Sequence, residues 1–392
     1  MKPGVVAVAL GLAAANAFAY APCDSPAKYT AMNDSLQPWR NALTEKRFDD
    51  LERHFSGVVK SVEAGTLSDA EGSTLFSVFA VASPARDPLH REWIQRYPKS
   101  EAAYLAAAAY YLRLAFAARG DKFSDETSDE QFDAMGESMI KANELLDEAM
   151  RLSKRPTMAI SQRMRITTAT GNSVRTAQHY RKAIKDYPET LQVRYRYISA
   201  SNPKWGGSIP QLMAIVDDAK GMSESDQRYV KYMVQNEVAS SLETVNDDKR
   251  AVEVYEKTFL LCPGLEGALD SAIRLREKNK EYAAMLPLAE EFIKRFPARG
   301  RGYVSRGWSL YYTGKIKESF ADYEKAAELG YGRGFSGLAW YYETGTVVAK
   351  DPKRAAELYL AAAAQGVPGT KERAAAVREK AKAGASPVPA KP

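Results

Sequence analysis

Apolar positions recur at helical spacing in nearly every segment from Trp39 onward. Few stretches alternate apolar and polar residues, and clusters of β-branched residues are scarce. Residues 194–198 do alternate, but the stretch is short and lies between helical patterns, so it is also predicted to be helical. A last helix is predicted over residues 373–382, before a proline-rich tail of the kind that stays disordered. The pattern predicts an all-α protein.

Prolines mark the ends of several predicted helices. Each of four amphipathic segments closes with a proline: Pro98, Pro188, Pro263 and Pro297. Proline disfavours the helical conformation in the residue before it, so it stops a helix and turns the chain. Pro263 and Pro297 lie 34 positions apart (297 − 263), which is a spacing found in arrays of helical hairpins.

A repeat is visible in the C-terminal half. Lys-Ala-Ala-Glu-Leu-Gly at 325–330 returns as Ala-Ala-Ala-Ala-Gln-Gly at 361–366, 36 positions later. In the clearest unit, Gly307 allows close packing of the first helix, and Gly314 allows a turn that other residues avoid. Tyr323 and Ala326 are three positions apart and share one face of the second helix. Together with Tyr303 and Leu310, these residues resemble the tetratricopeptide pattern.

The next unit resembles a Sel-one-like repeat, a longer relative of the tetratricopeptide. Asp351 is expected to cap its second helix and Pro352 to occupy the first helical position. Residues 346–350 form the longer loop between the helices, and Ala339 stands where that family prefers glycine. The resemblance covers residues 303–366. It implies a right-handed α-solenoid of helix-turn-helix repeats, and such arrays usually bind other proteins.

The N-terminal half carries different motifs. Trp93 precedes an alanine-rich helix that ends in Ala-Arg-Gly at 118–120, and Trp-Gly-Gly follows at 205–207. This order resembles the bacterial domain of unknown function 4034 over residues 48–220. That family has no assigned activity. The expected organisation is a signal peptide (1–19), a lead-in segment (20–38), a helical N-terminal domain (39–220), the repeats (221–366) and a basic, Pro/Ala-rich tail (367–392).

The N-terminus predicts export. Lys2 precedes an apolar run at residues 5–15 and the small-x-small sequence Ala-Phe-Ala at 17–19, as in a cleaved signal peptide. The alternative is a membrane anchor, but the run is short of the ~20 residues that a spanning helix needs. We expect a periplasmic or secreted bacterial protein with no stable membrane insertion after cleavage. Cys23 and Cys262 either pair, as an oxidising compartment permits, or remain free thiols.

The charge argues against nucleic-acid binding. The whole chain carries +6. Removing Lys2 leaves +5, and residues 367–392 hold six Lys/Arg and two Glu, or +4. The folded body is therefore near +1 (5 − 4), whereas a nucleic-acid interface needs basic charge gathered on one face.

The sequence shows no motif for catalysis, a cofactor or a metal. It contains no nucleophile elbow, phosphate loop or dinucleotide loop. The histidines His54, His90 and His179 lack zinc-ligand spacing, and each is predicted to lie on a helix surface. The acidic run at 121–130 lacks the central glycine of a calcium loop. It is predicted to be a solvated loop before a helix at about 131–150.

Two polar features of the N-terminal half have alternative interpretations. Trp205-Gly-Gly-Ser is predicted to be a tight turn with Trp205 packed beneath it, and a ligand-facing loop is the alternative. Arg119 ends an apolar and hence buried helix. We predict that it is partly buried and paired with a carboxylate, and the alternative is ligand binding.

Aromatic residues provide the best functional hypothesis. Trp308 and Trp340 follow the small residue of the first helix in adjacent repeats, at a position that faces the concave groove in the tetratricopeptide pattern. Tyr311, Tyr312 and Arg301 lie nearby, and aromatic residues and arginines are frequent anchors of partner surfaces. The alternative is ordinary packing between repeats. The predicted partner-binding residues are Arg301, Trp308, Tyr311, Tyr312 and Trp340.

We therefore expect a non-catalytic scaffold that binds a protein or peptide in the cell envelope. The competing hypothesis is an envelope enzyme or glycan-binding module with a site in the N-terminal domain. It requires Arg119, a carboxylate and Trp205 to converge on one pocket.

Overall fold

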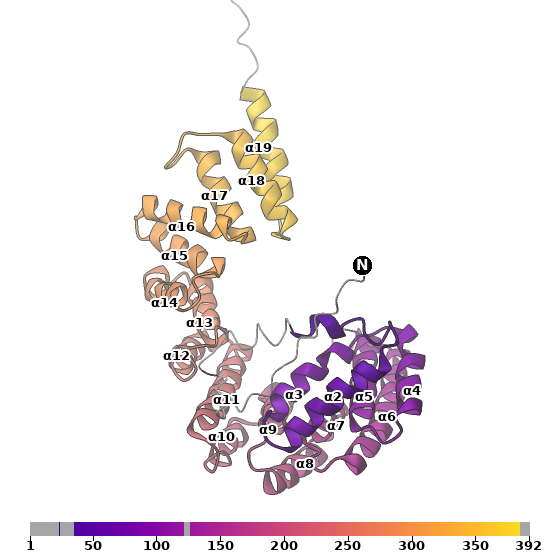
Figure 1. Ribbon diagram of the computed structural model, residues 1–392. Coiled ribbons are helices and arrows are strands. Elements are labelled where there is room, and N and C mark those ends of the chain that lie inside the picture. The colour runs from indigo at the N-terminus through magenta and orange to yellow at the C-terminus, as the bar shows by residue number, and fades with distance from the viewer. Residues whose placement is uncertain (1–22, 24–34, 121–125, 385–392) are drawn as a thin grey trace, which may run out of the picture. The chain divides into compact units, whose positions relative to one another are not determined.

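The computed structural model describes residue 23 and residues 35–120 and 126–384 (Figure 1). The predicted signal peptide, most of the lead-in segment, half of the acidic run and the last residues of the tail lie outside this range. Every regular element in the range is a helix, and the all-α prediction is confirmed. The chain divides into two compact units, Met1–Glu237 and Val238–Pro392.

In the first unit, helices that are distant in the sequence pack against one another. The helix α5 packs against α2, α4, α6 and α7, and α3 packs against both α7 and α9. The elements are η1 (Gln37–Trp39), α2 (Phe48–Glu63), α3 (Asp69–Leu75), η2 (Phe76–Phe79), η3 (Pro84–Arg86), α4 (Asp87–Arg96), α5 (Glu101–Arg119), α6 (Asp129–Leu152), α7 (Thr157–Ala169), α8 (Ser173–Asp186), α9 (Leu191–Ala200), η5 (Pro203–Trp205) and α10 (Ile209–Asp217). The next helix, α11 (Glu224–Thr244), contains the division between the two units.

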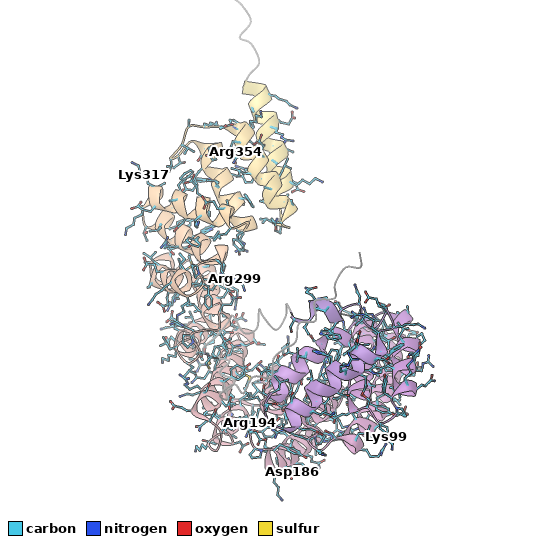
Figure 2. All side chains as sticks on the ribbon, in the orientation of Figure 1. Lys99, Asp186, Arg194, Arg299, Lys317 and Arg354 are labelled. Atoms are coloured by element: carbon cyan, nitrogen blue, oxygen red, sulfur yellow. The ribbon has the colours of Figure 1, made fainter. Side chains whose placement is uncertain are left out.

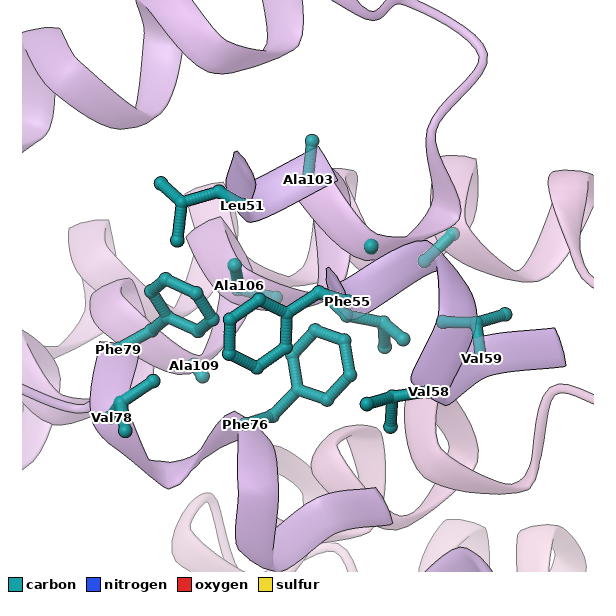
Figure 3. Packing of buried hydrophobic residues seen from close by; sticks show 14 of the residues in the cluster. Leu51, Phe55, Val58, Val59, Phe76, Val78, Phe79, Ala103, Ala106 and Ala109 are labelled. Atoms are coloured by element: carbon teal, nitrogen blue, oxygen red, sulfur yellow. The ribbon is translucent and has the colours of Figure 1, made fainter. Parts of the chain in front are cut away.

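The core of the first unit forms around the alanine-rich helix α5. Three phenylalanines from α2 and η2 lie together over alanines of α5 (Figure 3). The ring centroid of Phe55 lies 5.1 Å from that of Phe76 and 4.7 Å from that of Phe79. Large rings can approach the α5 backbone because its side chains there are small. This complementarity explains why a helix so rich in alanine buries eleven of its nineteen residues.

Buried polar bonds fix α9 within the same unit. Asp69, at the start of α3, accepts hydrogen bonds from the backbone N–H groups of Leu191 (3.1 Å) and Gln192 (3.2 Å), and also from the Thr190 hydroxyl. Arg194, labelled in Figure 2, is fully buried and donates to the carbonyls of Thr190 (2.8 Å) and Asp218 (2.9 Å). Formation of α9 is therefore coupled to a helix about 120 residues earlier in the chain.

The second unit is a row of helices, each packed mainly on the next one in the chain (Figure 1). They pair as hairpins, with α15–α16 and α17–α18 corresponding to the two repeats predicted from the sequence. The helices are α12 (Asp248–Thr258), α13 (Gly267–Lys278), α14 (Tyr282–Arg295), α15 (Gly300–Tyr312), α16 (Ile316–Glu328), α17 (Gly332–Thr344), α18 (Pro352–Ala364) and α19 (Thr370–Gly384). The predicted stacked hairpins of the tetratricopeptide type are confirmed.

Local signals in the sequence give the ends of these helices. The helices α4, α8 and α14 each end two residues before a proline, and α12 ends five residues before Pro263. Gly314 turns the chain with a φ of 85°. The Asp351 side chain accepts from the N–H of Arg354 at 2.9 Å, and Pro352 opens α18. Residues 194–198 are helical, as predicted.

One aromatic ring is enclosed by the backbones of three successive helices. Tyr323 of α16 is 7% exposed and lies between Gly307 of α15 and Gly337 of α17. A Cβ at Gly307 would lie 3.2 Å from the ring, and a Cβ at Gly337 only 2.1 Å from it. Gly337 is therefore needed for the ring to fit, whereas at Gly307 a side chain would only tighten the contact. The sequence indicated Gly307 and Tyr323 but not Gly337.

Both cysteines, Cys23 and Cys262, are buried and disulfide-bonded. Neither is a free thiol, so the free-thiol alternative is wrong. Across the described ranges, no helix combines the length and apolar character needed to cross a bilayer.

Candidate functional site

Aromatic side chains of α14 and α15 form a stack in the second unit. Tyr282 opens α14, and its ring lies 4.0 Å from that of Tyr312 at an angle of only 7°. The ring of Trp308, one turn before Tyr312, lies 6.2 Å from Tyr282 and 5.5 Å from Tyr312. Tyr312 is 53% exposed. Packing thus orients the stack while part of its surface remains open to a ligand.

The stack continues toward α17 through Tyr311 and Trp340. These two rings meet edge to face at 5.3 Å, and Trp340 meets Tyr341 in the same way at 5.1 Å. Together with Trp308 and Tyr312 of the stack, they line a pocket of about 540 Å³. Tyr323 also contributes to its wall, so the ring that joins the repeats is also part of the pocket.

Charged residues line a second pocket of about 870 Å³ beside the first. Arg301, with a side chain only 15% exposed, donates to Asp270 at 2.8 Å and to Glu277 at 2.9 Å. Glu277 also accepts from Arg333 of α17 at 3.4 Å. Burial alone would lower the pKa of Arg301, but these two carboxylates raise it, so the guanidinium stays charged.

The two pockets form one groove, which we call the aromatic groove. Glu277, Trp308 and Arg333 line both of them. The first helices of successive hairpins, α13, α15 and α17, supply most of the lining. All of these residues belong to the second unit. The groove combines flat aromatic faces with a fixed ion-pair network, an arrangement suited to holding an extended chain.

All five residues predicted as partner-binding line the aromatic groove. Trp308, Tyr311, Tyr312 and Trp340 line its aromatic part, and Arg301 lines its charged part. Because Arg301 already forms ion pairs with two carboxylates, it holds the ion-pair network in place and has little freedom to bind a partner. Sequence reasoning missed Tyr282 and Glu277. Both come from repeats whose pattern is too divergent to align, and only the fold brings them to the groove.

Arg306, which flanks the aromatic residues in the sequence, also has a structural partner. Its guanidinium binds both carboxylate oxygens of Asp322, at 2.8 and 2.6 Å. The Asp322 side chain is only 5% exposed. This bidentate ion pair holds α15 in contact with α16.

The polar candidates of the N-terminal half do not converge. Arg119 donates to the carbonyl of Gly120 at 3.5 Å, and no carboxylate among the described residues pairs with it. Trp205 is 62% exposed, so the prediction that it packs beneath its turn is wrong. The turn itself is confirmed: Gly206 has a φ of 85°, and a Cβ at Gly207 would lie 2.0 Å from the Ser201 carbonyl oxygen. Neither Arg119 nor Trp205 lines the aromatic groove or the pocket between α6, α7 and α8.

The histidines differ from the prediction in one case. His90 is 1% exposed, and its ring lies 4.8 Å from that of Tyr110. Burial, with Arg86 nearby, lowers the pKa of His90 to about 3. His54 stacks on Trp39 at 4.1 Å and is half-buried. Within the described ranges, no three metal-ligating side chains lie close enough together to hold an ion.

Known proteins resemble the chain in parts. No curated protein matches it. Among solved structures, MamA 41-end from Desulfovibrio magneticus RS-1 is 21% identical, covers 43% of this chain and 90% of its own, and has a TM-score of 0.32. The Cut9-Hcn1 hetero-tetramer of the APC/C is 12% identical, covers 86% of this chain and 68% of its own, and has a TM-score of 0.25.

The TPR domain of P58(IPK) is likewise 12% identical, covers 90% of this chain and 99% of its own, and has a TM-score of 0.23. These similarities are low, and the hairpins themselves carry the fold assignment. Residues 35–175 match the model of the Domain of unknown function (DUF4034), which confirms the resemblance for Trp93 and the Ala-Arg-Gly motif at 118–120. The Trp-Gly-Gly motif at 205–207 lies outside the matched residues. The second unit is an array of tetratricopeptide-like hairpins.

Proposed function

We propose that this protein is an exported, non-catalytic scaffold that binds a protein or peptide partner in the bacterial cell envelope through the aromatic groove. The observation that carries the proposal is the partly open stack of Tyr282, Trp308 and Tyr312 beside a fixed ion-pair network. Rigid rings offer large contact area and lose little conformational freedom on binding, so they are effective anchors.

Packing between repeats accounts for only part of this arrangement. Trp340 contacts Tyr311 and Tyr341, which are its neighbours in the array. Tyr312, in contrast, is more than half exposed although its ring is held by Tyr282. A residue that served packing alone would be expected to bury more of its apolar ring. The exposed edge of the stack therefore favours a binding role.

The disulfide-bonded state of both cysteines supports export. Structural disulfides persist in oxidising compartments such as the bacterial periplasm and are rare in the cytosol. This agrees with the signal peptide expected at residues 1–19. Cell fractionation, with N-terminal sequencing of the mature protein, tests both expectations. A cytosolic protein with an intact N-terminus would contradict the proposed location.

The groove is tested by comparing partner capture between matched variants. The test variant is Trp308→Ala with Trp340→Ala, and Tyr312→Ala removes only the exposed edge of the stack. Trp205→Ala is the control, because Trp205 is an exposed tryptophan outside the groove. Each tagged protein is purified from the native envelope, and co-purifying proteins are quantified by mass spectrometry.

We expect a partner that is retained by the Trp205→Ala protein and lost by both groove variants, while far-UV circular dichroism shows an unchanged helix content. Equal capture by all variants, or capture lost equally with the control, would contradict a binding role for the groove. Because Tyr312 is exposed, its variant separates lost binding from lost folding.

A further inference from the structure

Three arginines from neighbouring helices of the first unit lie close together. Arg113 belongs to α5, Arg165 to α7 and Arg196 to α9, and α7 packs against both of the other helices. We call these three residues the arginine cluster. The guanidinium carbon of Arg165 lies 5.0 Å from the ring centroid of Phe116 on α5. Because Arg113 and Phe116 are three positions apart, both lie on the face of α5 that Arg165 approaches.

Two members of the arginine cluster are half-buried and have no partner of opposite charge. No hydrogen bond or ion pair joins the guanidinium of Arg165 or Arg196 to another residue that the structure describes. The Nε atom of Arg196 is fully buried and also lacks an acceptor. Buried charges in proteins are normally paired or hydrogen-bonded, because their removal from water is costly. The described residues therefore leave the charge of the cluster uncompensated.

Other arginines of the same helices do have partners. Arg163, two residues before Arg165, donates to the Asp147 carboxylate at 2.7 Å. Arg194, two residues before Arg196, is fully buried and donates to two backbone carbonyls. The first unit thus pairs or bonds its other buried guanidinium groups on these helices, and the arginine cluster is an exception.

The positive charges of the cluster act on one another. Burial, together with the nearby Arg196 and Arg113, lowers the pKa of Arg165 to about 10. Burial also lowers the pKa of Arg196. Within the described ranges, Tyr195 is the one group that opposes these two shifts, and no carboxylate does so. Charges shift the pKa of a neighbour in this way mainly at short range, so the cluster is compact.

Aromatic rings compensate only part of this charge. Besides the contact of Arg165 with Phe116, the guanidinium carbon of Arg196 lies 5.2 Å from the ring centroid of Tyr195. The face of a ring attracts a cation, but it supplies neither a full negative charge nor an acceptor oxygen. The N–H groups of the two guanidiniums therefore stay without acceptors.

The arginine cluster is open to solvent. Arg113 is exposed, Tyr195 is 43% exposed, and both half-buried arginines keep part of their surface in contact with water. An anion can therefore reach the guanidinium groups without a rearrangement of the helices.

We propose that the arginine cluster binds a phosphate group, either as free phosphate or as a phosphate monoester. A phosphate dianion carries concentrated negative charge, which suits a compact set of three cations, and its oxygens accept several N–H bonds at once. An extended acidic chain spreads its charges over several residues, so it matches a compact cluster less closely. The site belongs to the first unit and is separate from the aromatic groove.

Isothermal titration calorimetry of the full chain with inorganic phosphate tests the proposal, with the chloride concentration held constant. We expect saturable binding at a single site, and glycerol phosphate as a second probe shows whether free or esterified phosphate binds more tightly. Arg165→Gln and Arg196→Gln should each weaken binding by roughly tenfold or more, because each removes charge-assisted hydrogen bonds. Arg181→Gln is the matched control, since Arg181 lies on α8, donates to the carbonyl of Ala177 and carries the same charge outside the cluster.

The stability of the ligand-free protein gives a second readout. Loss of one of several unpaired like charges relieves repulsion, so Arg165→Gln should unfold in phosphate-free buffer at the same urea concentration as the wild type or a higher one. Phosphate should raise the urea midpoint of the wild type and leave that of Arg165→Gln unchanged. An arginine that served only the packing of α7 would show the reverse, a lower midpoint without phosphate and the usual gain with it, and that result would contradict the proposal.

The pH dependence identifies the charge of the bound anion. The second proton of a phosphate monoester dissociates with a pKa of about 6, so the affinity for glycerol phosphate should rise as the pH increases from about 5 to 7. Sulfate is a dianion throughout this range and should bind without such a slope.

The absence of phosphate binding by the wild type would overturn the proposal. Equal weakening by Arg165→Gln and Arg181→Gln would also overturn it, because the effect would then reflect net charge and not the cluster. Binding of a glutamate-rich peptide in place of phosphate would assign the cluster to an acidic protein partner and would likewise refute the phosphate site. These outcomes are independent of the aromatic groove, which lies in the other unit.

Discussion

Replacing Gly337 with alanine tests the packing on which the second unit depends. A Cβ at this position would lie 2.1 Å from two ring carbons of Tyr323. Ordinary contacts between carbon atoms are about 3.5–4.0 Å, so ring and methyl must separate by about 1.4 Å or more. The ring can withdraw only part of this distance, because its other edge faces the backbone of α15 at Gly307.

Two opposing contributions to the free energy of unfolding, overpacking and helix preference, determine the expected change in stability. Overpacking of a well-packed core destabilises by about 1–3 kcal/mol. Alanine is favoured over glycine inside a helix by about 1 kcal/mol. An approach of 2.1 Å to two ring carbons places this overpacking in the upper part of that range, at about 2–3 kcal/mol. After the helix preference of about 1 kcal/mol is subtracted, we expect Gly337→Ala to lower the free energy of unfolding by about 1–2 kcal/mol. Gly136→Ala is the control, because Gly136 lies inside α6 with no atom within 4 Å of its added Cβ, and it should stabilise by about 0.5–1 kcal/mol.

Hydrogen exchange with mass spectrometry locates the effect in the chain. Peptides from α16 and α17 should exchange about 5–30 times faster in Gly337→Ala than in the wild type. Adding Tyr323→Leu should recover part of the loss relative to the sum of the two single changes, because the smaller side chain makes room for the methyl group. If Gly337→Ala left exchange in α16 and α17 unchanged or slowed it, the close approach of Tyr323 to α17 would be refuted.

Three further changes test other parts of the chain, each by urea unfolding. Arg306→Ala leaves the buried Asp322 without its bidentate partner and should destabilise by about 1–3 kcal/mol, whereas adding Asp322→Ala should restore part of the loss. Burial, together with the nearby Glu63, raises the pKa of Glu101 to about 7, so the folded state keeps a proton that the unfolded state releases. Stability should fall as the pH rises from about 4.5 through 7, and Glu101→Gln should remove this fall. The pKa of His90, lowered to about 3, has the opposite consequence: stability should be lost as the pH falls below about 6.5, and His90→Phe should abolish this loss. A pH profile unchanged by either substitution would contradict the assigned burial.

Local signals were sufficient to predict much of the fold. Pro188 and Pro297 end helices because of the backbone of the preceding residue, and Asp351 caps α18 with its own side chain. These effects act within a few residues, so they can be recognised in the sequence. The aromatic groove was partly predicted for the same reason, because Trp308 and Trp340 recur in step with the repeat.

Properties that depend on distant residues were not predictable from these signals. His90 lies in a charged helix and has the appearance of a surface residue, but Phe79 and Tyr110 from two other elements enclose it. Trp205 has the composition of a packed turn, but no element covers it. Tyr282 and Glu277 contribute to the groove only because α13, α14 and α15 are stacked. In each case the deciding contact joins helices whose pairing the sequence does not specify.

The two patterns of helix packing have consequences for how the units lose structure. In the second unit most contacts join consecutive helices, so α19 can detach while the helices before α18 keep their neighbours. Such an array responds to force in small steps from its C-terminal end. In the first unit, Asp69 ties α3 to α9 across about 120 residues, so loss of either helix removes support from the other. Under force, the first unit should therefore unfold in one abrupt event, whereas the second should unfold gradually. The first unit also has the higher contact order, so it should refold more slowly.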